Sequence, residues 1–155
     1  MLFTGCSPVG PGSDTSNDRL PPPPVSADAV VVPRSAKGRA PVIDRTTPEG
    51  VLASIKDIIA TDALDSLKSF CHPEITAGSP VKLMCAISTE DMDQIDKFRI
   101  WFGSARLDSA IMLNGDTARI PLTLAPGDPA RERHATLMLL RHEGTYYLNN
   151  LVWRR

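Results

Sequence analysis

The pattern of apolar and polar positions changes its period once along the chain, near Gly103. Before that point, apolar residues recur at helical spacing. The clearest predicted helix begins at Thr47-Pro48-Glu49, where Thr47 is a good N-cap, Pro48 suits the first helical position and Glu49 complements the helix dipole. Its apolar face consists of Val51, Leu52, Ile55, Ile58 and Ile59.

Two further helical stretches are predicted before the change of period. A short helix follows the break at Thr61-Asp62, and Pro73 ends it because the residue before a proline avoids helical geometry. Its apolar face is Leu64, Leu67, Phe70 and Cys71. Residues 79–102 then predict one or two helices, with a start at Thr89-Glu90-Asp91. The apolar face of the last one is Met92, Ile95, Phe98 and Phe102.

After Gly103 the apolar residues alternate with polar ones, which predicts strands. Asn114-Gly115 is a strong signal for a two-residue hairpin turn, and it would pair Leu113 with Asp116 and Leu107 with Leu122. A second hairpin is expected from residues 133–141 and 145–153, turning at Glu143-Gly144. The fold class is therefore α+β, with N-terminal helices packed against a curved four-stranded antiparallel meander sheet.

Composition separates residues 1–45 from the predicted domain at residues 46–155. Nine of the 14 prolines lie within residues 1–48, and Pro21-Pro22-Pro23-Pro24 favours an extended stretch. Such a segment buries too little apolar area to offset its ordering entropy, so it is expected to be a disordered tether. The proline run is interpreted as a stiff spacer, or alternatively as a ligand for a proline-recognising domain. The apolar run Ala29–Val32 could add an edge strand, but Pro33 stops it.

Charge limits the expected partners. The chain has 17 Lys and Arg residues against 18 Asp and Glu, with no basic run, so nucleic acid is not expected as a partner. No segment approaches the roughly 20 apolar residues of a membrane-spanning helix.

The order of these elements resembles a known family. The helix opening at Thr47-Pro48-Glu49, the run Asp62–Leu67 and the terminating His72-Pro73-Glu74 resemble the start of a nuclear-transport-factor-2-like domain. The hairpin at Asn114–Ala118 and the ending Glu143–Leu148 are similar to the sheet of its small bacterial lipoprotein members. The resemblance implies a cystatin-like roll, in which a curved sheet wraps a long helix. That superfamily includes both enzymes and non-catalytic modules, so it does not imply an activity.

Cys6 is the most informative single residue. Leu2-Phe3-Thr4-Gly5-Cys6 resembles the end of a bacterial lipoprotein signal, in which the cysteine carries the lipid. Phe3 departs from the usual leucine, and no charged or apolar region precedes the motif in this sequence. We expect lipidation at Cys6 and a membrane-anchored position in the bacterial cell envelope; a chance match in a cytosolic protein is the alternative.

The remaining candidate sites have simpler structural explanations. Cys71 and Cys85 could form a disulfide in an oxidising compartment, although their apolar neighbours favour plain core packing. His134 and His142 lie about 26 Å apart on a strand and cannot share a metal. The carboxylates of Asp91, Asp93 and Asp96 fit a solvated helix start. No catalytic residue, metal site or cofactor is predicted.

Association is expected through the sheet, because both faces of the second hairpin are largely apolar. With a regular register, Leu140 pairs with Tyr147 and Met138 with Asn149. The helices cover the face of Leu137 and Leu139, and the other face must meet the tail, a partner or a second copy. A homodimer, or a contact with another envelope protein, is predicted through Met138, Leu140, Tyr147, Leu151 and Trp153.

Together these features predict an envelope-anchored, non-enzymatic binding or interaction domain. The alternative is a small-molecule-binding protein or a cofactor-free enzyme that uses the cavity of the fold. A cavity lined by ionisable groups with perturbed pKa values would favour the alternative, whereas a cavity filled by Leu and Ile would favour the first hypothesis.

Overall fold

The computed structural model describes residues 38–155. The lipidation site predicted at Cys6, the proline run and the Ala29–Val32 segment lie outside the described residues. Within the described range, no helix is both long enough and apolar enough to cross a bilayer.

Helix α1 (Pro48–Ala60) begins where the sequence predicts. The Thr47 hydroxyl accepts a hydrogen bond from the backbone N–H of Gly50 at 3.0 Å, which confirms the N-cap. The face formed by Val51, Ile55 and Ile58 is completely buried, so this helix supplies the centre of the helical layer.

The stretch between α1 and the sheet forms four short elements. They are η1 (Leu64–Phe70), α2 (Ser79–Ala86), η2 (Ile87–Thr89) and α3 (Met92–Gly103). Because Leu64, Leu67 and Phe70 recur at intervals of about three residues, they line one side of a 3₁₀ helix, and all three are buried. The Asp91 side chain caps α3 by accepting from Gln94 N–H at 3.0 Å. Met92 does not belong to the buried face of α3, since it is 62% exposed.

The sheet is antiparallel and has five strands, which confirms the α+β class but corrects the predicted number. The strands are β1 (Arg106–Leu107), β2 (Met112–Asn114), β3 (Thr117–Leu124), β4 (Arg133–His142) and β5 (Thr145–Arg154). Their order is β1-β3-β4-β5, and β2 pairs with β3 on the edge that β1 also uses.

The strand predicted before the first hairpin turn is divided into β1 and β2, and Pro121 of β3 explains this division. Its carbonyl points towards β1, where it accepts from Asp108 N–H at 3.0 Å. Pro121 has no N–H to complete a ladder on that side, and the partner strand leaves β3 opposite it. Leu107 pairs with Leu122 as predicted, but beyond the break Leu113 pairs with Ala118, and the turn lies at Gly115-Asp116. The predicted Leu113–Asp116 pair is therefore wrong.

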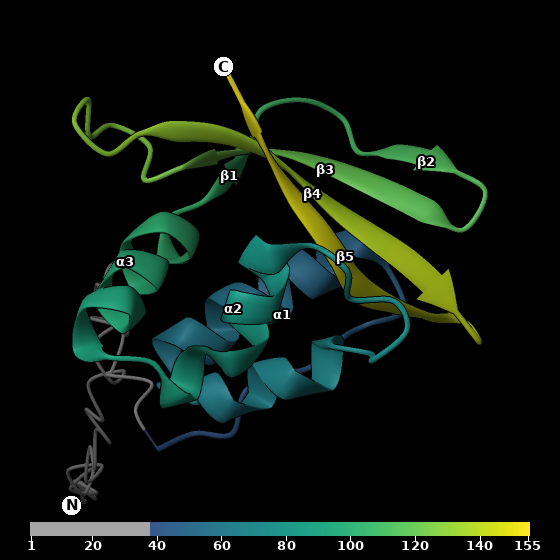
Figure 1. The fold of residues 1–155 in the computed structure, drawn as a ribbon, viewed down its shortest axis with the longest axis horizontal. Coiled ribbons are helices and arrows are strands. Elements are labelled where there is room, and N and C mark those ends of the chain that lie inside the picture. The colour runs from purple at the N-terminus through teal and green to yellow at the C-terminus, as the bar shows by residue number, and fades with distance from the viewer. Residues whose placement is uncertain (1–37) are drawn as a thin grey trace, which may run out of the picture. The chain divides into compact units, whose positions relative to one another are not determined.

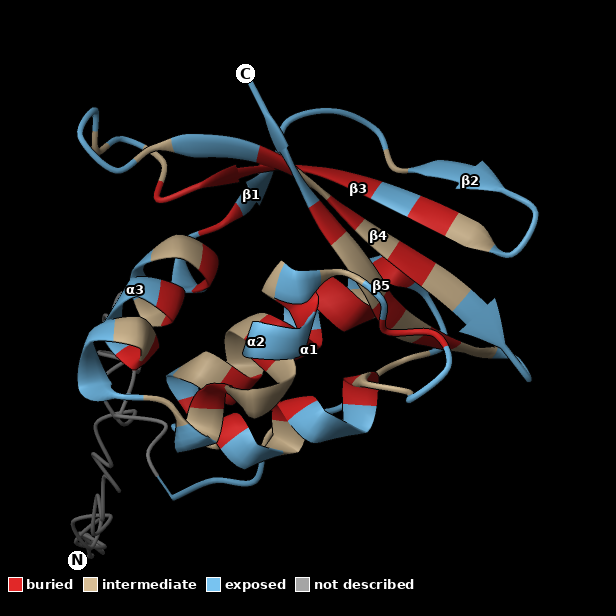
Figure 2. Ribbon diagram, in the orientation of Figure 1, coloured by how far each residue is buried: buried red, intermediate tan, exposed pale blue. Residues whose placement is uncertain are grey.

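Helices and sheet form two layers (Figure 1). The helices lie on one face of the sheet (Figure 2). Buried positions alternate along β4 and along the first part of β5, whereas residues 120–124 of β3 are all buried. That inner face supplies Ile120, Leu122, Leu137, Leu139 and Leu148, all with no exposed surface.

Strand β5 contains a bulge that changes which side chains face the core. Leu139 pairs with Leu148, whereas Met138 pairs with Asn150, so Asn149 is the extra residue. From Asn150 onward the alternation is inverted. Leu151 pairs with Leu137 and is buried, while Val152 lies on the outer face and is 45% exposed.

The same extra residue attaches the loop before α2 to the free edge of β5. The Asn149 carbonyl accepts from the N–H groups of Ala77 and Gly78, both at 3.1 Å, and its side-chain amide donates to the Ile75 carbonyl at 2.7 Å. The Thr76 hydroxyl donates to the Leu148 carbonyl at 2.7 Å. These bonds satisfy backbone groups that an exposed edge would leave available for aggregation.

A disulfide between Cys71 and Cys85 spans this edge-covering loop. It joins the residue after η1 to α2, with a sequence separation of 14. Both cysteines also pack against the hydrophobic core, so the bond connects the loop to the helical layer.

The ordered domain begins before the predicted boundary at residue 46. Arg39 pairs with Asp57 of α1, and Val42 N–H donates to the same carboxylate at 2.6 Å. The Arg45 carbonyl accepts from Tyr146 N–H at 2.8 Å and so continues the cover of the β5 edge. Composition places residues 39–45 in the tether, but these contacts attach them to the domain.

Gly78 offers a direct test of the edge contact. A Cβ at residue 78 would overlap the Asn150 side chain and lie 3.1 Å from its Cα. Gly78→Ala is therefore expected to lower the free energy of unfolding by about 1–3 kcal/mol in urea titration. Gly103→Ala is the matched control, because its Cβ would meet only Ile59 Cγ2 at 3.5 Å. Equal stability of the two variants would contradict the close approach at Asn150.

Candidate functional site

The space between helices and sheet is packed with buried apolar side chains. A narrow cavity there, the apolar slot, has a volume of about 90 Å³ and lies between α2, α3 and β5. Met84, Phe98 and Leu151 contribute to its walls. Ligand pockets usually measure about 300–1,000 Å³, so this slot is too small for an enclosed substrate.

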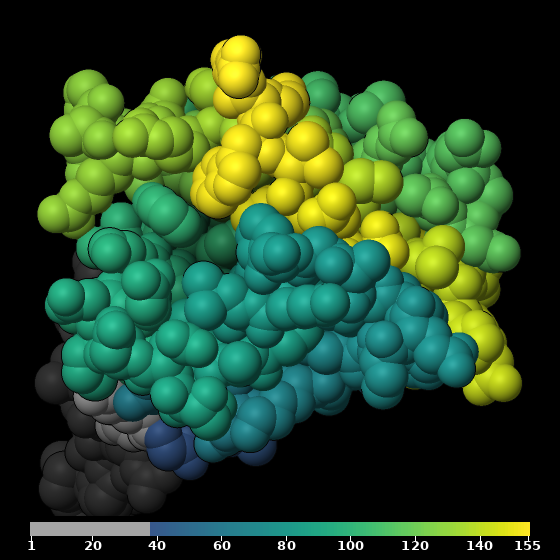
Figure 3. Space-filling view, viewed as in Figure 1, coloured from purple at the N-terminus to yellow at the C-terminus, as the bar shows by residue number. Residues whose placement is uncertain are grey.

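A larger hollow opens beside the slot, where α3 meets the C-terminal end of β5. We call it the tryptophan groove and define it by Trp101, Arg133, His134, Trp153 and Arg154, which enclose about 440 Å³. The two indole rings meet edge to face with centroids 5.4 Å apart. Trp153 remains 42% exposed although it lies on the inner side of β5. Figure 3 shows this face of the molecule, with the end of β5 in yellow above α3.

The groove continues between α3 and the β3–β4 loop into a second hollow of about 460 Å³. Trp101 and Arg133 line both hollows. Asp93, Lys97 and Trp101 are spaced four residues apart on α3, so they form one stripe along the helix and face Arg131 across the hollow.

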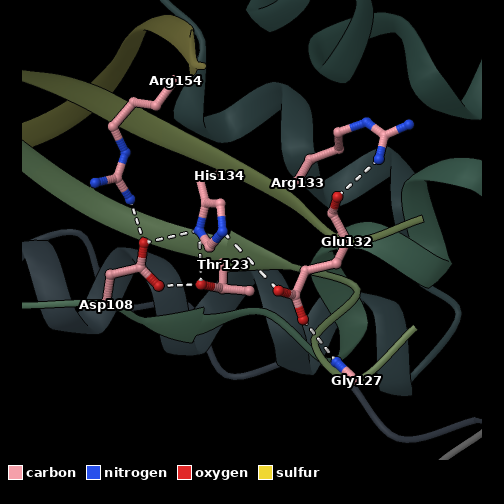
Figure 4. A network of polar contacts seen from close by, with 7 residues as sticks. All are labelled: Asp108, Thr123, Gly127, Glu132, Arg133, His134 and Arg154. Atoms are coloured by element: carbon pink, nitrogen blue, oxygen red, sulfur yellow. Dashed lines mark hydrogen bonds and ion pairs between the residues drawn. The ribbon is translucent and has the colours of Figure 1, made fainter. Parts of the chain in front are cut away.

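A polar network on the outer face of the sheet supports the groove (Figure 4). Asp108 accepts hydrogen bonds from the Thr123 hydroxyl, from Arg154 and from His134 Nδ1, the last at 3.2 Å. These partners come from β3, β5 and β4, so one carboxylate links three neighbouring strands. It also fixes two side chains of the groove, His134 and Arg154.

The rest of the network positions Arg133 and the β3–β4 loop. Glu132 accepts from Gly127 N–H at 2.8 Å, and its backbone carbonyl accepts from Arg133 Nη1 at 2.8 Å. His134 Nε2 lies 3.9 Å from Glu132 Oε1. The imidazole is therefore placed between two carboxylates, one on each side of the ring.

The network does not have the geometry of a nucleophilic triad. A triad needs the hydroxyl and the carboxylate on opposite ring nitrogens. Here Thr123 Oγ1 and Asp108 both approach His134 Nδ1, each at 3.2 Å. Thr123 is also buried, so its hydroxyl is poorly placed to attack a substrate.

Asp108 is held in its ionised form. Partial burial acts to raise the pKa of Asp108, but hydrogen bonds from Thr123, His134 and Arg154, together with the charge of Arg154, outweigh it and keep that pKa below its usual value. A carboxylate with a lowered pKa is a weak general base near neutral pH.

Of the five residues predicted on the outer face of the second hairpin, the structure places three there. Met138, Leu140 and Tyr147 do lie on it and are half-buried. Leu151 and Trp153 do not, because the bulge at Asn149 moves both to the inner side of the sheet. Asp108 and Arg119 also lie on the outer face.

A second cluster lies near the turn between β4 and β5. His72 is 5.2 Å from the Tyr147 ring and 5.4 Å from the His142 ring, measured between centroids. The Arg45 guanidinium lies over Tyr147 at 5.5 Å. Within residues 38–155, no three His, Cys, Asp or Glu side chains gather as metal ligands would. This cluster is therefore interpreted as packing of the edge-covering segments on β5.

No family model, curated protein or solved structure matches the chain. The site must therefore be interpreted from its own geometry. Sequence patterns did not identify the tryptophan groove, because its residues come from α3, β4 and β5 and meet only in the folded domain. The available signal was that both tryptophans of the chain, Trp101 and Trp153, lie in amphipathic elements.

Replacement of Asp108 should produce a pH-dependent loss of stability. Its pKa is lowered by folding, so ionisation of Asp108 stabilises the domain above the unfolded-state value of about 3.9, and this stabilisation is lost as pH falls through the folded-state pKa. Asp108→Asn is expected to cost about 1 kcal/mol at neutral pH, since the site is partly exposed.

Urea titrations at several pH values measure this difference. The gap between wild type and Asp108→Asn should narrow below about pH 4. Glu74→Gln is the control, because the exposed Glu74 side chain accepts no hydrogen bond within the described part of the chain. A gap that is constant across pH would show that the carboxylate charge of Asp108 contributes nothing to stability.

Proposed function

We propose that the chain is a non-enzymatic binding domain of the nuclear-transport-factor-2-like type, held at a bacterial cell envelope through a lipid on Cys6. In this proposal the sheet is the curved meander of that family, and the helices fill its concave side. The tryptophan groove is the surface that contacts the partner.

The filled interior is the observation that carries this proposal. In an enzyme or a ligand carrier built on this fold, the space between helices and sheet would hold the substrate. Here that space is occupied by side chains such as Phe70, Leu137 and Leu148, which have no exposed surface. The slot beside these side chains measures about 90 Å³, and this small volume supports binding at the rim over chemistry inside the domain.

The polar groups also support a binding role over catalysis. Asp108 is committed to three hydrogen-bond donors, and Thr123 is buried behind it. By contrast, the groove exposes tryptophan and arginine, the residue types that most often dominate the energetics of protein interfaces.

The anchor is supported by sequence alone. Thr4-Gly5-Cys6 has the small residues of a lipidation motif, and a proline-rich segment follows it. Mass spectrometry of the native protein should find lipid on Cys6. An unmodified Cys6 would remove the anchor from the proposal and leave the binding site unaffected.

Site-specific photo-cross-linking in the native cell tests the binding role. A photoreactive residue at Leu83, in the wall of the slot, or at Ala130, beside Trp101, is expected to yield the same adduct. The same residue at Glu74, an exposed position that lines neither the slot nor the groove, is the control. Trp153→Glu should reduce the adduct from both groove positions. Equal adducts from Glu74, or none from the groove, would contradict the proposed site.

A second role, homodimerisation through the outer sheet face, is favoured by a separate observation. Met138, Leu140 and Tyr147 are half-buried there, and Val152 and Met112 are exposed. These side chains form an apolar surface on the side of the sheet away from the helices, which a second copy would cover.

The bulge allows a sharp test of the dimer, because it places neighbouring residues on opposite sides of the sheet. Sedimentation equilibrium should show a dimer at micromolar concentration that Val152→Glu dissociates and Trp153→Glu does not. A monomeric wild-type chain would disprove the dimer. A dimer that is sensitive only to Trp153→Glu would place the interface at the tryptophan groove instead.

A further inference from the structure

We propose that the tryptophan groove and the adjoining apolar slot bind an acidic segment of a partner protein. One aliphatic side chain of that segment enters the slot, and its carboxylates lie against the cations of the groove. The proposal rests on the binding function above and specifies the chemistry of the partner.

The slot sets the size of the apolar anchor. At about 90 Å³ it is smaller than the cavities of about 150 Å³ that admit a benzene molecule. Its walls include Met84, Phe98 and Leu151, all buried apolar side chains. One aliphatic side chain fits such a space, and a bulky aromatic ring does not.

The charges around the slot indicate that the partner segment is acidic. The slot and the two hollows beside it are lined by four Lys and Arg side chains, but by only two carboxylates. The cations are Lys97, Arg131, Arg133 and Arg154. Arg131 pairs with Asp128 and Arg154 with Asp108, so the positive charge that a partner would meet comes from Lys97 and Arg133.

Two of these cations are available to a partner. Within residues 38–155, neither Lys97 nor Arg133 forms an ion pair with a carboxylate. Lys97 lines both the slot and the hollow between α3 and the β3–β4 loop, and Arg133 lines both hollows. A carboxylate next to the anchored side chain would therefore meet a positive charge on either side of Trp101.

The concave shape favours a peptide over a lipid surface. Aromatic residues that insert into a bilayer must project towards it, together with basic residues that meet anionic headgroups. Here Trp101 and Trp153 pack against each other within a hollow of about 440 Å³. A peptide chain can enter that hollow, whereas a flat bilayer cannot follow it.

Selection from a displayed library of random heptapeptides tests the proposal with the full chain as bait. Arg133→Glu serves for counter-selection, since it reverses one charge of the groove and keeps a long polar side chain. The enriched sequences are expected to combine Asp or Glu with a neighbouring Leu, Ile, Val or Met. Enrichment of basic or uncharged sequences, or no enrichment over the Arg133→Glu bait, would overturn the proposal.

Intrinsic fluorescence then locates the binding site, because the two tryptophans of the groove are the only ones in the chain. An enriched peptide should change the emission. Its affinity should fall about tenfold in Arg133→Glu and remain unchanged in Lys56→Glu, the control on α1, which lines neither the slot nor the groove. Replacing its acids by amides should weaken binding similarly. An equal response to phosphatidylglycerol vesicles would assign the groove to a lipid surface and overturn the peptide proposal.

The two proposals can fail separately. Cross-linked adducts at Leu83 and Ala130 without selection of acidic peptides would keep the binding function and reject this partner chemistry. Absence of both results would reject the groove as a binding surface.

Discussion

The architecture depends on the one extra residue in β5. A strand presents successive side chains to opposite faces, so an insertion inverts every later position. Asn149 therefore puts Leu151 into the core and turns Trp153 towards α3. The carbonyl of the same residue receives two N–H groups of the loop that closes the sheet edge. The core, the groove and the protected edge thus share one local irregularity.

Local interactions explain what could be predicted from the sequence. Thr47 caps α1 through a side chain three residues from its donor, and the period of Leu64, Leu67 and Phe70 defines a helix without any distant partner. The hairpins are similarly local, which is why the pairs Leu107–Leu122 and Leu140–Tyr147 follow from the alternation of apolar positions. The α+β class therefore follows from the pattern.

The predictions from sequence fail where the structure depends on the backbone geometry of single residues or on contacts between distant elements. Pro121 in the sequence indicated an interrupted edge strand, because a proline has no N–H to donate to the neighbouring strand. The bulge had a weaker signal, the polar pair Asn149-Asn150 inside an apolar strand. The groove had almost none, since Trp101 and Trp153 belong to elements whose contact depends on how α3 packs against β5. A site of this kind is defined by packing and not by a motif.

The Cys71–Cys85 bond has a consequence for proteolysis. Between these two residues the chain follows two covalent routes, one through the backbone and one through the disulfide. A protease that cuts the exposed Pro73-Glu74 stretch would leave both fragments joined. The carbonyl of Asn149 could still hold Ala77 and Gly78 against β5 in the cut molecule. The exposed part of the edge cover can thus be nicked without releasing either half of the domain.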